Sequence, residues 1–170
     1  VEELWLNPSN FLMLAQNIKN GFDEYLTNHY IKNDLNDKFE ELKIEISNLD
    51  AAFTILVENS VNKDIIVNDD VFSFLSKYGF NVISLDEDTA TDKTIASAKE
   101  LIANGTANTI FALRNDELSD TVNKLVKETN IKVTYLHGLS NITETERSNK
   151  DNYLSIMNGN IELIKEQLYK

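Results

Sequence analysis

The spacing of apolar residues changes near residue 60. Before that point apolar side chains recur at every third or fourth position, which predicts amphipathic helices. One helix follows the cap and first-turn residues Asn7 and Pro8. A second runs from about Ile31 to Glu58 and would reach about 40 Å at 1.5 Å per residue. A coiled coil has the same spacing, but the segments that follow favour packing against a domain.

After residue 60 short β-branched runs alternate with helical stretches, which is typical of parallel βαβ units. The predicted strands are Asp64–Val67, Asn81–Leu85, Thr109–Leu113 and Ile131–Leu136. The predicted helices are Val71–Lys77, Asp92–Asn104, Ser119–Thr129 and Asp151–Leu168, with Gly79 and Gly105 at helix ends. The sequence therefore predicts an α/β fold: a parallel four-stranded sheet flanked by helices and preceded by a long helix.

Composition narrows the choice of partner. The 170 residues carry a formal charge of −12, which disfavours nucleic acid and anionic lipid and favours a cationic ligand. Cysteine is absent, so disulfides and thiolate metal sites are excluded. No signal peptide or membrane-spanning apolar run is present, and the start at Val1 reads as the middle of a segment. We expect a fragment or a mature product.

Polar residues follow each predicted strand. Ligands of open parallel sheets bind beyond the carboxyl ends of the strands, and there the chain places Asp69, Asp86 to Asp88, Asp116 and His137. Carboxylates with an imidazole suit manganese, iron or zinc. Local sequence also allows simpler roles: Asp69 as a helix N-cap, His137 as a hydrogen-bonded loop histidine, and Asp86 to Asp88 as a solvated turn.

Other chemistry has little support in the sequence. The five glycines match neither phosphate-binding nor dinucleotide-binding spacing, and no G-x-S-x-G elbow occurs. A phosphoacceptor site at Asp69 and Asp70 would require a lysine at the end of a late strand, and His137 occupies the nearest such position. We therefore expect that the protein is not an enzyme.

Several ordered motifs resemble the zinc and manganese solute-binding lipoproteins of ABC transporters, an adhesin-like family. Trp5 to Pro8 is similar to the family's H-x-W-L-x-P segment, and Asp69 to Phe74 with Tyr78-Gly79 is similar to its H/E-x-A-F-x-Y and Y-G motifs. The remaining matches are Ile110-Phe111, Leu136 to Leu139, and Tyr153 to Met157 with Asn160. The resemblance covers the whole chain.

The resemblance implies the C-terminal part of a two-lobe protein that holds a metal between its lobes. It divides the chain into a remnant helix of the N-terminal lobe (1–29), a long bridging helix (30–59) and a C-terminal α/β lobe (60–170). The implied function is extracytoplasmic capture of a divalent transition metal, manganese or zinc, as cargo for an ABC permease. The full-length form would be anchored to the membrane as a lipoprotein.

The resemblance also implies the metal ligands. It points to Glu3, where the family has histidine, to Asp69, where it has His or Glu, and to His137, where it has Asp. Leu113 replaces a common glutamate. This oxygen-rich set favours harder ions such as Mn²⁺. The alternative is a degenerate family member that binds no metal and acts as an adhesion or protein-interaction module.

Overall fold

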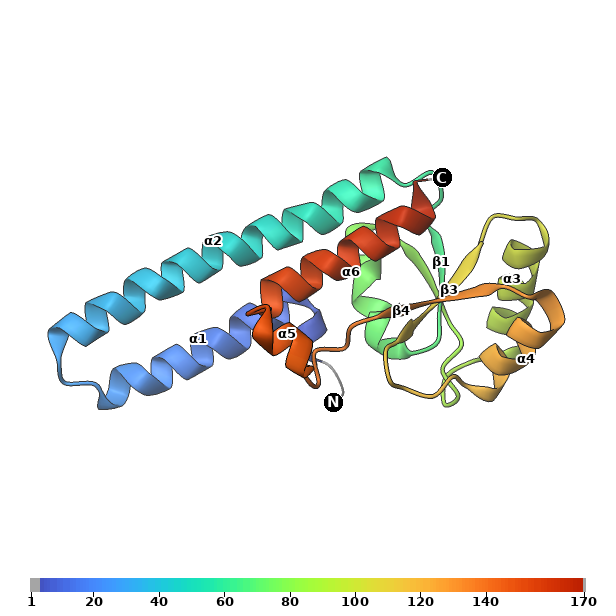
Figure 1. Ribbon diagram of the computed structural model, residues 1–170. Coiled ribbons are helices and arrows are strands. Elements are labelled where there is room, and N and C mark those ends of the chain that lie inside the picture. Colours follow the sequence, from blue (N-terminus) through green and yellow to red (C-terminus); the bar gives the residue numbers. More distant parts are fainter. Residues whose placement is uncertain (1–3, 170) are drawn as a thin grey trace.

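A sheet of four parallel strands forms the centre of the protein (Figure 1), in a computed structural model that describes residues 4–169. The strand order is β2-β1-β3-β4. The strands are β1 (Asp64–Val67), β2 (Asn81–Ser84), β3 (Thr109–Leu113) and β4 (Lys132–Leu136). The predicted fold class is confirmed, and each strand lies within one residue of its predicted bounds.

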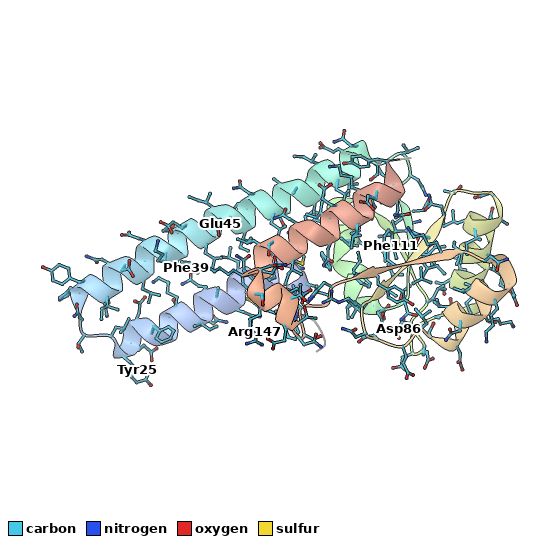
Figure 2. The ribbon with its side chains drawn as sticks, in the orientation of Figure 1. Tyr25, Phe39, Glu45, Asp86, Phe111 and Arg147 are labelled. Atoms are coloured by element: carbon cyan, nitrogen blue, oxygen red, sulfur yellow. The ribbon has the colours of Figure 1, made fainter. Side chains whose placement is uncertain are left out.

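Helices cover both faces of the sheet. One face packs against α2 (His29–Asn59), η2 (Asp70–Tyr78) and α6 (Tyr153–Leu168) through the larger apolar core. The other face packs against α3 (Asp92–Ala103) and α4 (Asp120–Thr129) through a smaller core. Alternation along the strands produces this division, because in β1 Ile65 and Val67 join the first core and Ile66 joins the second. Phe111 of β3, labelled in Figure 2, belongs to the first core.

The first part of α2 extends away from the sheet and forms a helical hairpin with α1 (Pro8–Tyr25). The second part of α2 packs against the sheet through the larger apolar core (Figure 1). The apolar side chains toward the end of α1 are exposed: Ile18 is 62% exposed, and Tyr25, labelled in Figure 2, is 84% exposed. The side of α1 that meets α2 carries Lys19, which bonds Asp23 and lies over the Phe39 ring.

Two local elements differ from the prediction. Asp70–Tyr78 forms a 3-10 helix, and its buried residues Phe72 and Leu75 have the spacing of three that aligns side chains in such a helix. The short helix α5 (Glu144–Ser148) was not predicted. A capping box between Thr143 and Glu146 begins it. Within residues 4–169, no helix combines the length and apolar character that a bilayer crossing requires.

Gly79 ends η2 in a left-handed conformation, with φ of 111°. Gly79→Ala is expected to lower the free energy of unfolding by about 1–2 kcal/mol, because a Cβ makes this conformation unfavourable. Urea denaturation measures the change. Gly21→Ala is the matched control: Gly21 lies inside α1, an added Cβ there meets nothing within 4 Å, and alanine favours a helix. Equal stability losses in the two variants would contradict the prediction.

Candidate metal site

Three separate segments meet at the carboxyl ends of the strands. The indole Nε1 of Trp5, in η1 (Leu4–Leu6), donates to the carbonyl oxygen of Gly138 after β4 at 3.0 Å. The Tyr153 hydroxyl donates to the carbonyl oxygen of Trp5 at 2.9 Å. The same η1 segment contacts η2, which begins after Asp69. The segment that follows Glu3 therefore contacts both η2 and the loop after β4. Glu3 itself lies outside the described residues.

Asp69 occupies the N-cap position of η2, but its side chain makes no capping hydrogen bond. Its Oδ2 instead accepts from the side-chain nitrogen of Asn68 at 2.8 Å. Burial raises the pKa of Asp69, and the negative charges of Asp116 and Asp86 raise it further. The charges that shift this pKa all come from other carboxylates, and such an electrostatic setting favours a bound cation.

Asp69 lines an acidic hollow of about 640 Å³. Asp86, labelled in Figure 2, lies on the same rim, and its Oδ1 accepts from the backbone N–H of Asp88 at 3.0 Å. This bond confirms the turn expected at Asp86 to Asp88, and a capping box at Thr91 begins α3 just after it. The carboxylates that line the hollow are Asp69, Asp86, Glu87, Asp88, Asp116, Glu117 and Asp120.

His137 is buried and firmly held. Its backbone N–H donates to Oδ1 of Asn160 at 2.8 Å, and the Asn160 amide donates back to the His137 carbonyl at 2.9 Å. Its ring Nδ1 accepts the backbone N–H of Leu139 at 2.8 Å. The hydrogen-bonded loop histidine considered from the sequence is therefore present. The other ring nitrogen, Nε2, is buried and has no hydrogen-bond partner among the described residues.

Glu146 lies beside that nitrogen, with 3.4 Å between its Oε1 and the His137 Nε2. Oε1 accepts from the Arg114 guanidinium at 2.8 Å, and Oε2 accepts from both the N–H and the hydroxyl of Thr143 at 2.8 Å. The Thr143 N–H, the Arg114 guanidinium and the Thr143 hydroxyl together lower the pKa of Glu146 to about 2. Glu146 is therefore an anion over the physiological pH range.

The described part of the chain does not contain a complete metal site. Among residues 4–169 no group of three or more histidine, cysteine, aspartate or glutamate side chains is arranged to hold a metal ion. Asp69 lines the acidic hollow, and His137 lines a separate one of about 350 Å³ with Arg114 and Glu146. The ligand set of Glu3, Asp69 and His137 therefore stays a prediction.

Sequence reasoning missed the residues that hold the loop after β4. The Thr143-x-x-Glu146 spacing is a capping-box signal and could have located α5. Nothing local indicated that Arg114 would pair with Glu146, or that Trp5 would bond Gly138, because these partners are 32 and 133 positions apart in the chain.

The chain is similar in structure to several metal-binding proteins. It superposes on the Zn(II)-bound ZnuA-like domain of Streptococcus pneumoniae AdcA with a TM-score of 0.72 and 19% identity, covering 99% of this chain and 64% of that one. It superposes on the metal-dependent lipoprotein YcdH of Bacillus subtilis with a TM-score of 0.75 and 18% identity, covering 99% and 64%. For the laminin-binding protein Lbp of Streptococcus pyogenes the TM-score is 0.75 and the identity 20%, covering 98% and 63%.

These likenesses show the fold, and the chain spans less than two thirds of the length of each of these structures. No curated protein sequence matches the chain. The family profile described as ZnuA, zinc-uptake complex component A, periplasmic, matches residues 2–167. Proteins of this family are transport components and not enzymes. The chain therefore belongs to the zinc-uptake complex component A family, which confirms the resemblance seen in its sequence.

Proposed function

We propose that the protein is the extracytoplasmic solute-binding component of an ABC transporter for a divalent transition metal, zinc or manganese. Family membership supports the metal and the location. The observation that carries the proposal is the contact of η1 with η2, together with the bond from Trp5 to Gly138. These contacts support the proposal because η1 follows Glu3, η2 follows Asp69 and Gly138 follows His137.

Glu3, Asp69 and His137 are the proposed ligands. Asp69 is an acceptor-only side chain that is half-buried among like charges, so a divalent cation relieves an unfavourable interaction there. The acidic hollow around it attracts cations and raises their local concentration. Two carboxylates and one imidazole form a donor set for Zn²⁺ that also accommodates Mn²⁺, with the oxygens favouring the harder ion.

The partner that we propose is an ABC permease, which receives the metal as cargo. A lipoprotein anchor on the full-length form would keep the carrier beside that permease. No bond of a substrate is broken in this role, so binding and release are the whole chemistry of the protein.

Isothermal titration calorimetry of the metal-depleted full-length protein, with its N-terminal lobe intact, tests this function. We expect one Zn²⁺ or Mn²⁺ per chain and no saturable heat with Mg²⁺, which prefers full octahedral oxygen coordination. Absence of heat with both Zn²⁺ and Mn²⁺ would overturn the carrier function. It would leave the degenerate adhesion or protein-interaction module as the remaining explanation.

Trp5→Phe tests whether the junction between η1 and the loop after β4 supports the site. The variant keeps an aromatic ring but loses the indole N–H, so the Gly138 carbonyl loses its donor. We expect the free energy of unfolding to fall by about 1 kcal/mol and Zn²⁺ affinity to fall by about tenfold. Tyr30→Phe, at an 87% exposed position, is the control. Zn²⁺ affinity equal in both variants would show that the junction does not support the site.

A further inference from the structure

The hydrogen bonds of His137 fix the position of its ring proton. Nδ1 accepts the Leu139 backbone N–H, so the lone pair lies on Nδ1 and the proton of the neutral ring lies on Nε2. Nε2 is buried and has no hydrogen-bond partner within residues 4–169, and the Glu146 Oε1 lies 3.4 Å from it. The ring therefore has a lone pair on its loop-facing edge and an N–H on the edge that faces a carboxylate.

Glu146 is held rigidly as an acceptor. Both of its oxygens already accept hydrogen bonds from donors, Oε1 from Arg114 and Oε2 from Thr143. A carboxylate fixed in this way favours the proton on the facing Nε2 of His137. The side chain of Glu146 is 16% exposed and that of His137 10%, so solvent competes little for their contact.

We propose that Glu146 is a positioning residue that holds His137 in the tautomer whose Nδ1 lone pair binds the cargo metal. This inference rests on the proposed function. The metal would replace the Leu139 N–H at Nδ1, while Nε2–H donates to Glu146. Carboxylate–histidine–metal arrangements of this kind orient the ring and raise its basicity as a ligand.

Two further features favour Nδ1 over Nε2 as the ligand atom. A cation at Nε2 would have to displace the ring proton and would lie near the Arg114 guanidinium, which pairs with the same Glu146 oxygen. On the other edge, Leu139 has φ of 63°, a strained value for a residue with a branched side chain.

Nitrogen-15 NMR of histidine-labelled protein tests the inference, because His29 and His137 are the only histidines in the chain. Without metal, we expect a protonated Nε2 and an unprotonated Nδ1 in His137. With Zn²⁺, we expect the Nδ1 resonance to shift and Nε2 to keep its proton. A metal-free ring protonated on Nδ1, or Zn²⁺ bound through Nε2, would overturn the proposal. Both results come from the unaltered protein, so they do not depend on a variant folding.

Glu146→Gln supplies the second measurement, with Glu144→Gln as its matched control. Both substitutions remove one charge from α5, but Glu144 is 92% exposed and lies 3.9 Å from Arg147. We expect Glu146→Gln to mix the two His137 tautomers and to weaken Zn²⁺ binding by about 10–100-fold, with little change in the control. Equal affinities and spectra in the two variants would overturn the proposal. Failure of the unaltered protein to bind Zn²⁺ would instead contradict the proposed function, while its metal-free tautomer still tests the role of Glu146.

Discussion

Asp69→Asn is expected to weaken Zn²⁺ binding by about 100-fold or more while it stabilises the metal-free protein. Loss of a direct ligand should weaken metal binding by more than the 10–100-fold that is typical when a residue hydrogen-bonded to a ligand is replaced. The gain in stability follows from the raised pKa of Asp69, which reflects the unfavourable burial of its charge near Asp116 and Asp86. Asparagine has nearly the same shape without that charge.

The pH dependence of stability shows why Asp69→Asn should stabilise the metal-free protein. A carboxyl group with a raised pKa in the folded state costs stability as pH rises from its unfolded value of about 3.9 through its folded value. Above that window the charged form opposes folding, so asparagine is favoured at pH 7 and its advantage disappears in acid. Urea denaturation of metal-free protein at pH 7 measures it, with the exposed Asp88→Asn as control. A less stable Asp69→Asn variant, or unchanged Zn²⁺ affinity, would contradict the prediction.

Phe53→Ala is expected to lower the free energy of unfolding by about 3–5 kcal/mol, the usual range for removal of a buried aromatic side chain. Phe53 is 1% exposed in α2. Its ring lies 5.0 Å from that of Tyr78 and 5.8 Å from that of Phe74, so it joins α2 to η2. The alanine variant would leave a cavity between these helices.

Ile55→Ala is the control for Phe53→Ala, because Ile55 lies two positions later in the same helix and is 54% exposed. Thermal and urea unfolding of both variants would measure the difference. A loss below about 1 kcal/mol for Phe53→Ala would show that this contact contributes little to stability.

The strands were predictable because short apolar runs with polar residues after them are enough to locate a strand in the sequence. Val67 and Leu113 end β-branched or apolar runs that polar residues follow, and the structure ends β1 and β3 at these residues. The environment of α1 was not predictable in the same way. Its apolar residues recur with helical spacing, but spacing alone does not show which of them other elements cover: Phe11 stacks on Tyr153 of α6, while Phe22 is 54% exposed.

The candidate site was also only partly predictable from the sequence. Its predicted location at the strand ends follows from general rules for parallel sheets, and Asp69 and the Asp86 turn both line the hollow there. The state of His137 depends on Asn160 and Glu146, which reach it only through the fold. A single sequence does not contain that information locally.

The proposed metal site can be tested by a crystal structure of the zinc-loaded protein, with anomalous data collected at the zinc edge. We expect one anomalous peak within about 2.0–2.2 Å of a carboxylate oxygen of Asp69 and of the Nδ1 of His137, with Glu3 as a further ligand. A zinc peak elsewhere, with Asp69 and His137 both outside its coordination shell, would overturn the proposed site.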